Sequence, residues 1–204
     1  MLVYIEYISR RPHVSLEQFH AVAGHGQTGW AGDNPGDVLI AMLGRTWRTG
    51  PEPEYLGIWY TPGQGLGRFD DWERIFRSGA ADAFEEPFSI GARIDRAGSY
   101  APLLEPVPGT SERYYLERFD WAEGASADDV RASFEERRDR HSGLALNAVL
   151  DRIGRLAPDP RGVALWSLPD WAALEQIARD HDAGDGPVRL VDAGMYSTLG
   201  KETL

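Results

Sequence analysis

The sequence predicts an α+β protein made of two copies of one β-α-β-β-α-β unit, with their antiparallel sheets packed face to face. The first observation is a repeated order of signals: V-Y-I-E-Y-I from Val3 is followed much later by Y-Y-L-E-R-F from Tyr114. Tyr4 and Tyr115 are 111 residues apart (115 − 4 = 111). The second observation is that the helix starts Ser15 and Ser126 keep the same offset (126 − 15 = 111). Two half-chains with one order of signals indicate a fused pair of units rather than a solenoid.

The spacing of apolar residues predicts the strands and helices of the first copy. The opening strand is rich in β-branched and aromatic residues, and Ser15 with Gln18 forms a helix-starting capping box after it. The second helix carries aromatic and aliphatic residues at helical spacing. The strands are expected at Leu2–Ile8, Asp37–Trp47, Glu54–Tyr60 and Phe88–Tyr100, and the second helix at Phe69–Arg77.

The second copy repeats this order after a proline-rich linker, P-L-L-E-P-V-P-G, at Pro102–Gly109. We therefore expect repeat 1 to span 1–108 and repeat 2 to span 109–204. The strands are expected at Arg113–Phe119, Leu144–Leu156, Gly162–Ser167 and Val188–Tyr196, and the helices at Ala127–Arg140 and Trp171–Arg179. The predicted unit is ferredoxin-like, with both helices on one face of a four-stranded sheet.

The strands are apolar on both sides, which predicts that each sheet is covered on both faces. The first strand shows this with Val3, Ile5 and Tyr7 on one side and Leu2, Tyr4 and Ile8 on the other. Helices cover one face, and the partner sheet is the natural cover for the other. Two facing sheets are expected to enclose a lumen suited to a small molecule.

Composition and charge exclude several functions. The net charge of −11 disfavours a nucleic-acid partner and an anionic membrane surface. The absence of cysteine removes disulfides and thiolate chemistry, and no apolar run is long enough to cross a bilayer. We expect a cytoplasmic protein whose partner is a small apolar molecule. A self-sufficient monomer or a homodimer is expected, because the second copy replaces a partner subunit.

Several stretches resemble the dimeric α/β-barrel superfamily, and within it the NIPSNAP and EthD-like group. They are V-Y-I-E-Y-I-S-R-R-P from Val3, Y-L-G-I-W-Y from Tyr55, F-D-D-W-E-R-I-F from Phe69 and L-L-E-P-V-P from Leu103. R-H-S-G-L from Arg140 is similar to the helix-end K-H-G of that group. The resemblance implies the barrel architecture. It leaves the reaction open, because the superfamily includes cofactor-free oxygenases, isomerases, haem enzymes and proteins of unknown role.

Glu6 and Glu117 are the first candidates for chemistry, because they occupy the same position in the two copies. If they face the lumen together with Tyr4 and Tyr115, burial raises the pKa of each carboxyl and suits it to acid–base work. The alternative is that each glutamate lies at the barrel rim and is paired to an arginine, with Arg10, Arg45 and Arg118 as candidates.

The two copies differ most at Gly24–Gly36, which holds five glycines where the second copy continues as a helix. Glycine is unfavourable inside a helix, so the first helix is expected to end near Ala23. We expect this loop to flank the pocket mouth, with His25 as an acid–base group or Trp30 as a wall. The alternative is a plain mobile loop.

Aromatic side chains are expected to line the pocket, and the wall residues are predicted to be Tyr4, Trp30, Trp59, Tyr115 and Trp166. Core packing is the alternative. No pair of histidines has metal-site spacing, so no metal ligands are expected. The haem-binding relatives place an axial histidine in their C-terminal copy, and this resemblance makes His181 the candidate ligand.

The expected function is that of a small-molecule enzyme without a bound cofactor, acting on an apolar, aromatic or polyketide-like carbonyl compound. Glu6, Glu117 and His25 would carry proton transfer that leads to isomerisation, cyclisation or cofactor-free oxygenation. One alternative is a non-catalytic ligand-binding or scaffold protein of the NIPSNAP-like type. A haem enzyme is the minority alternative.

Overall fold

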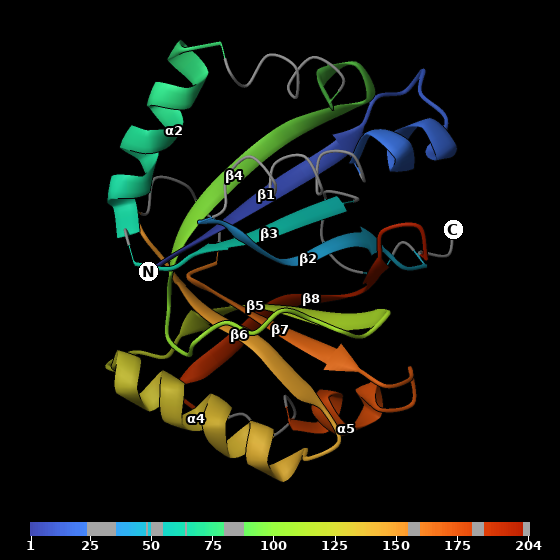
Figure 1. Ribbon diagram of the computed structural model, residues 1–204. Helices are drawn as coiled ribbons and strands as arrows, with labels where there is room; N and C mark the ends of the chain where they lie inside the picture. Colours follow the sequence, from blue (N-terminus) through green and yellow to red (C-terminus); the bar gives the residue numbers. More distant parts are fainter. Residues whose placement is uncertain are drawn as a thin grey trace.

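Eight antiparallel strands close into a single barrel in the computed structural model of the protein (Figure 1). The structure describes residues 1–23, 36–47, 49, 55–63, 65–79, 88–154, 160–180 and 186–201. Around the barrel the strands follow the order β1-β3-β2-β8-β5-β7-β6-β4, and β4 pairs with β1. The predicted fold class, two ferredoxin-like units with antiparallel sheets facing each other, is confirmed.

The helices and strands have the following bounds. The first half contains β1 (Leu2–Arg10), β2 (Val38–Arg45), β3 (Tyr55–Thr61), α2 (Arg68–Arg77) and β4 (Ala92–Pro102). The second half contains β5 (Arg113–Trp121), α4 (Ala127–Arg140), β6 (Ala145–Arg152), β7 (Gly162–Leu168), α5 (Leu174–Ala178) and β8 (Val188–Thr198). Residues 16–23 are also helical, and Gly65–Gly67 form a 3-10 turn before α2.

Both predicted helix starts are built as capping boxes. Ser15 and Gln18 exchange side chain–backbone hydrogen bonds of 3.1 and 2.9 Å. Ser126 and Asp129 do the same at the start of α4, at 3.2 and 2.8 Å. Each box satisfies backbone N–H groups that have no partner within the helix.

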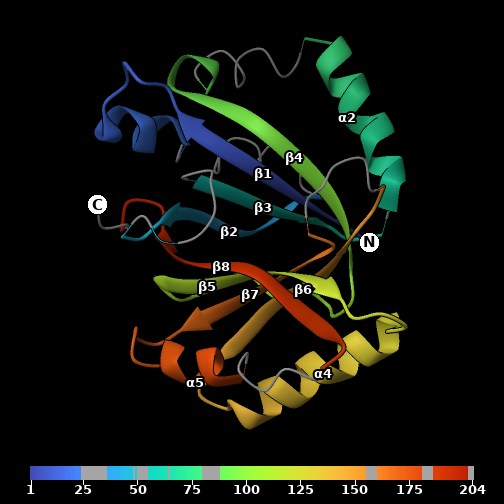
Figure 2. The same ribbon diagram turned by 180° about the vertical axis from the view of Figure 1, so that it is seen from behind.

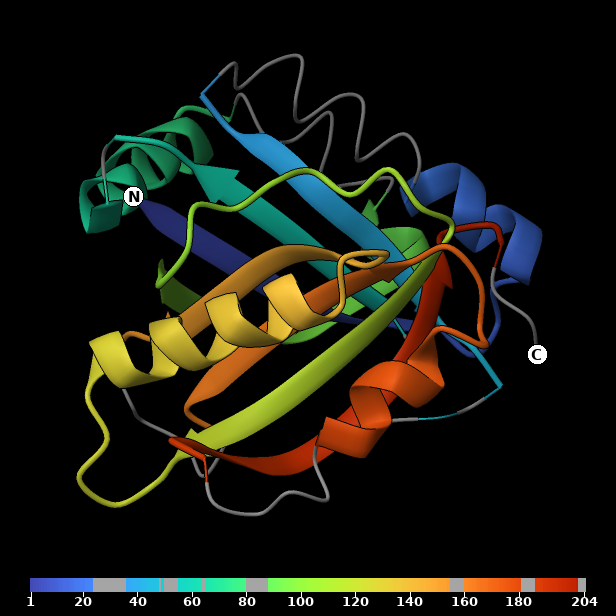
Figure 3. The ribbon, with the colours of Figure 1, turned by 90° about the horizontal axis from the view of Figure 1, so that it is seen from below.

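The barrel closes because the two four-stranded sheets join edge to edge. At one seam β2 pairs with β8, with Arg45 opposite Tyr196. At the other seam β4 pairs with β6, with Tyr100 opposite Arg152. The helices lie outside, with α2 over the sheet of the first half and α4 and α5 over the sheet of the second (Figures 1 and 3).

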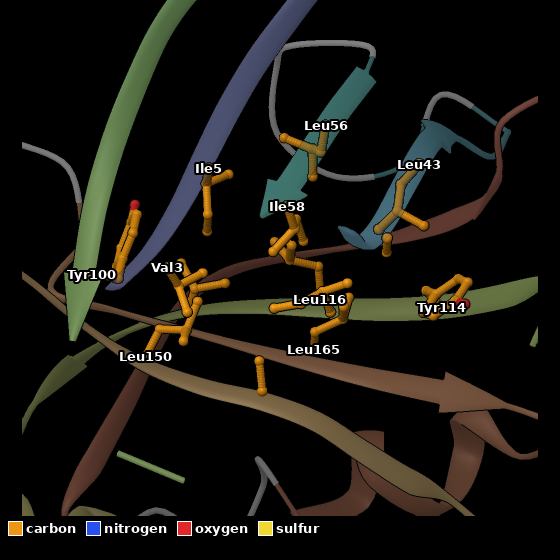
Figure 4. Close-up of a cluster of buried hydrophobic side chains, with 14 of the residues drawn as sticks. Val3, Ile5, Leu43, Leu56, Ile58, Tyr100, Tyr114, Leu116, Leu150 and Leu165 are labelled. Atoms are coloured by element: carbon orange, nitrogen blue, oxygen red, sulfur yellow. The ribbon is translucent and has the colours of Figure 1, made fainter. Parts of the chain in front are cut away.

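The barrel interior is a packed apolar core, so the expected lumen pocket is wrong. Side chains from both halves point toward one another there (Figure 4), and Val3, Ile5, Leu116 and Leu165 are at most 2% exposed. An eight-stranded barrel is just wide enough for its own side chains to fill. The side of β1 that faces inward is Val3, Ile5 and Tyr7.

Several element boundaries also differ from expectation; the strand expected at Leu144–Leu156, for example, is Ala145–Arg152. Residues 88–91 form a helical turn, and the last strand of the first half begins only at Ala92. The last helix is the short α5, whereas Trp171 was expected to begin it. In the described part of the chain, no helix has the length and apolarity that a bilayer crossing requires.

Candidate functional site

The first half places Glu6 on the outer face of β1, toward the helices. Its sheet neighbours on this face are Tyr4 and Ile8, because alternate residues of a strand share a side. The expectation that Glu6, Tyr4 and Trp59 face the barrel interior is therefore wrong. They lie in the layer between sheet and helices, where Trp59 packs with Ile8, Phe19 and Met42.

The Glu6 carboxylate has one hydrogen-bond donor among the described residues, the indole of Trp59. Trp59 Nε1 donates to Glu6 Oε2 at 3.2 Å. Burial raises the pKa of Glu6 to about 7. The hydrogen bond from Trp59 has the opposite, smaller effect and lowers this pKa. By its exposure, Glu6 is intermediate between the buried and the exposed residues. A carboxyl that titrates near neutrality suits general acid–base chemistry.

Tyr4, beside Glu6 on this face of β1, belongs to a cluster of aromatic rings. Tyr4 meets Trp72 edge to face, with ring centroids 5.1 Å apart, and Trp72 meets Phe69 in the same way at 5.0 Å. Burial, with the nearby charge of Glu6, raises the pKa of Tyr4 to about 12. Tyr4 is therefore a neutral phenol at physiological pH. The three rings form an apolar surface whose hydrogen-bonding groups include the Tyr4 hydroxyl.

Gly57 leaves the space that Glu6 occupies. It lies directly opposite Glu6 on β3, and a Cβ there would be 3.0 Å from Glu6 Oε2 and 3.2 Å from Trp59 Nε1. The corresponding position of the second half, opposite Glu117, is Ala164. The two halves thus differ in the room beside the glutamate.

A buried aspartate fixes α2 above this site, a role that the sequence analysis missed. Asp37 accepts hydrogen bonds from Thr61 Oγ1 at 2.5 Å and from Arg68 Nη2 at 3.1 Å. Trp72 Nε1 donates to the same carboxylate at 3.4 Å. Asp37 therefore ties the start of α2 to the end of β3. Its place before an apolar strand was the available signal, although it does not identify the partners.

The second half holds Glu117 in a closed ion pair. Arg137 of α4 donates to both carboxylate oxygens at 2.9 and 2.8 Å, and Glu117 is 1% exposed. The alternative of a glutamate paired to an arginine is thus correct for Glu117, but the partner is Arg137 and not Arg118. Arg118 instead pairs with Asp192 at 3.2 Å.

Further charges extend this pair. Arg137 Nε lies 3.4 Å from Asp180 Oδ2, and His141 Nε2 lies 2.6 Å from the same oxygen. Burial lowers the pKa of Arg137, but the hydrogen bonds and negative charges of Glu117 and Asp180 together outweigh burial and leave the pKa raised. His141 ends α4, as predicted. A bidentate, charge-assisted pair of this kind keeps both groups ionised.

The remaining predicted wall residues lie on the same outer layer of the second half. Tyr115 and Trp166 pack with Phe119 and Phe134 under α4, not in the barrel interior. Trp166 is fully buried, and its Nε1 has no hydrogen-bond partner in the described part of the chain. This layer is filled by its own side chains.

The two halves therefore hold equivalent glutamates in different electrostatic surroundings. Glu6 is opposite Gly57 and Glu117 opposite Ala164, in the same strand register. By the offset of 111, Arg137 corresponds to Gly26 (137 − 111 = 26). That difference was visible in the sequence, because the second copy has an arginine at this position and the first copy has a glycine. His25 and Trp30 lie outside the described residues, as does His181.

Among known proteins, the likeness is one of fold. No family model and no curated protein matches the chain. A candidate chlorite dismutase, TA0507, is 9% identical over 98% of this chain and 95% of its own, with a TM-score of 0.60. A candidate monooxygenase of Lactobacillus acidophilus is 12% identical over 98% and 97%, with a TM-score of 0.61. A dye-decolorizing peroxidase of Bacteroides thetaiotaomicron is 5% identical over 97% and 93%, with a TM-score of 0.56. These neighbours place the chain among dimeric α/β-barrel folds.

The sequence resemblance placed the candidate haem ligand, His181, in the second half of the chain. There the layer between sheet and helices is occupied by Trp166, Phe134 and the Glu117–Arg137 pair. The described histidine there, His141, is held by Asp180. These residues do not fit a haem, because a macrocycle would have to displace a buried ion pair together with its aromatic cover. Among the described residues, no three metal-ligating side chains gather.

Proposed function

We propose that the protein is an acid–base enzyme whose catalytic group is Glu6, acting on an apolar aromatic or polyketide-like carbonyl compound. The observation that carries this proposal is the difference between the two halves. Glu117 is neutralised by Arg137, whereas Glu6 is surrounded by aromatic and aliphatic groups and its pKa is raised to about 7. Perturbed titration of this kind gathers at functional sites.

The chemistry follows from the groups present. At pH 7 about half of a carboxyl with this pKa is ionised, and the ionised form can take a proton from a carbon next to a carbonyl group. The indole N–H of Trp59 would hold Glu6 in place, and the rings of Tyr4 and Trp72 would contact a flat substrate. Return of the proton elsewhere gives isomerisation, attack on a second carbonyl gives cyclisation, and reaction with dioxygen gives oxygenation.

The fold comparison supports small-molecule chemistry at a general level. Among the neighbours are a candidate monooxygenase and proteins named for peroxidase and chlorite dismutase activity. At these low identities the likeness concerns the fold, and the choice of reaction rests on the Glu6 site.

The test is proton exchange, the step that all three reactions share. The full-length protein is incubated in D₂O with a panel of aryl ketones that carry α-hydrogens, and deuterium uptake is followed by NMR. We expect at least one ketone to exchange faster than in buffer, and Glu6→Gln to lower the enzymatic rate by roughly 100-fold or more.

The control is Glu73→Gln, which removes an exposed carboxylate on the solvent side of α2 and should keep the wild-type rate. Exchange that Glu6→Gln leaves unchanged would contradict the assignment of Glu6. Saturable ketone binding without any exchange would instead favour the alternative of a non-catalytic ligand-binding protein.

A further inference from the structure

A hollow away from Glu6 lies at the seam where β2 meets β8. Figure 2 shows these two strands side by side. The hollow encloses about 170 Å³. Its lining residues are Trp47, Glu112, Arg113, Trp171, Ser197 and Lys201. None of them contributes to the Glu6 site, so a role for this hollow is independent of the proposed function.

Trp47 is held out from the surface in a strained conformation. Its φ of 56° is the only positive value of a non-glycine residue in the described ranges, and the residue is 61% exposed. A bulky side chain rarely adopts this backbone region, and such strain persists only where surrounding structure enforces it. An exposed indole on a strained backbone is costly for stability alone and therefore indicates a function.

Hydrogen bonds on both sides of Trp47 enforce that conformation. Thr46 N donates to the Met195 carbonyl at 2.9 Å, and Thr46 Oγ1 lies 2.7 Å from Ser197 Oγ. Thr49 Oγ1 donates to the Thr46 carbonyl at 2.8 Å and accepts from Met195 N at 3.0 Å. The turn is thus fixed to β8, and the indole is positioned before any ligand arrives.

The hollow carries positive charge in an acidic protein. Arg113 donates to the Pro169 carbonyl at 3.1 Å, and it pairs with no carboxylate in the described part of the chain. Lys201 Nζ lies 3.4 Å from Glu112 Oε1, and both side chains are about 60% exposed, so this pair is weak. Among the described lining residues, two cations, Arg113 and Lys201, therefore accompany one carboxylate, Glu112, although the whole chain carries −11.

We propose that this hollow binds a planar, single-ring aromatic carboxylate. The ring would contact the indoles of Trp47 and Trp171, and the carboxylate would pair with the guanidinium of Arg113. The volume agrees with one ring, because an engineered protein cavity of about 150 Å³ accommodates benzene. A surface hollow with one ion pair predicts a Kd on the order of 0.1–1 mM.

Benzoate is the probe, and the indole N–H signals of the ¹⁵N-labelled full-length protein are the readout. We expect the signals of Trp47 and Trp171, assigned from Trp47→Gly and Trp171→Phe, to move together along one saturable curve. Benzamide, which keeps the ring but loses the charge, should bind roughly 3- to 5-fold more weakly, as should benzoate to Arg113→Gln. Shifts that do not saturate, or equal binding of benzamide and benzoate, would overturn the proposal.

Trp47→Gly separates binding from folding. Glycine accepts a positive φ without strain, so this variant should keep or raise the Tm while benzoate binding is lost. Glu73→Gln, a distant surface change on α2, should bind benzoate as the wild type does. A lower Tm with unchanged benzoate binding would show that Trp47 has a structural role only and would overturn the inference.

Discussion

At the scale of single residues, the two glutamates show what a sequence can and cannot predict. Their equivalence was predicted correctly, because the constant offset of 111 residues between the copies places Glu6 and Glu117 at the same position of two similar strands. Their side was predicted wrongly, because both faces of β1 are apolar and alternation alone cannot say which face turns inward. The difference in their surroundings was not predicted, because Arg137 contacts Glu117 from a helix and not from a neighbouring strand.

The Trp59 hydrogen bond is expected to tune the Glu6 carboxyl. Trp59→Phe keeps the aromatic packing but removes the N–H donor to Glu6 Oε2. Because that bond stabilises the ionised carboxylate and lowers its pKa, the variant should raise the pKa of Glu6 above 7. An NMR titration of the Glu6 carboxyl measures this shift.

The matched control is Trp166→Phe in the second half, where the indole Nε1 has no described hydrogen-bond partner. This change should leave the titration of Glu6 where it is. A pKa of Glu6 that stays the same or falls in Trp59→Phe would contradict the role assigned to the hydrogen bond.

Arg137 is expected to be essential for stability because its removal leaves Glu117 buried without a counter-ion. Arg137→Met should lower the free energy of unfolding by about 3–5 kcal/mol. The double variant Glu117→Gln with Arg137→Met should recover much of this loss, since the buried charge of Glu117 is removed together with its counter-ion. Urea denaturation checks both, with the exposed Arg138→Met as the control near zero. Equal losses in the single and double variants would contradict the ion-pair explanation.

At the scale of elements, local signals predicted helices and strands well where they were strong. The α4 range was predicted in full, because a capping box starts it and a buried face at helical spacing continues it. The turn at 88–91 was not predicted, and the helix expected at Trp171–Arg179 is the shorter α5, since neither has a comparable start signal. The position of α2 depends on Asp37, which no periodicity reveals.

Asp37 is expected to hold α2 against the sheet. Asp37→Ala removes the acceptor of Thr61, Arg68 and Trp72, and leaves the Arg68 side chain, 11% exposed, without this partner. We expect a loss of about 3 kcal/mol and faster amide hydrogen exchange in α2. Glu73→Ala breaks only an exposed pair on the same helix and should cost under about 0.5 kcal/mol. Unchanged exchange in α2 would show that the helix is held by other contacts.

At the scale of the whole molecule, each sheet is the cover of the other. The architecture was predictable because a strand with apolar residues on both sides, such as β1, requires a covering layer on each face of its sheet. The filled interior was not foreseen, because the number of strands that close around it, and hence its width, depends on how the sheet edges meet. The pocket was therefore expected on the inner face of the sheet, whereas Glu6 lies on the outer face, toward the helices.

Neither half should fold alone. A chain limited to residues 109–204 would expose an inner face that includes Leu116, Leu150 and Leu165, each at most 2% exposed in the whole protein. We expect each half, 1–108 or 109–204, to aggregate or to lack near-ultraviolet circular dichroism, and the two halves co-expressed to form a complex. A half that is monomeric and cooperatively folded would contradict the view that the sheets depend on one another.

The central claim is that burial gives Glu6 of the first half a pKa near neutrality, whereas its counterpart Glu117 in the second half is held in an ion pair by Arg137. The most direct measurement is a ¹³C carboxyl titration of the full-length protein, with the Glu6 signal identified by its loss in Glu6→Gln. The account predicts a midpoint at about pH 7 for Glu6, because burial raises its pKa and Trp59 only partly offsets that rise. A midpoint near the ordinary glutamate value of about 4.3 would contradict it.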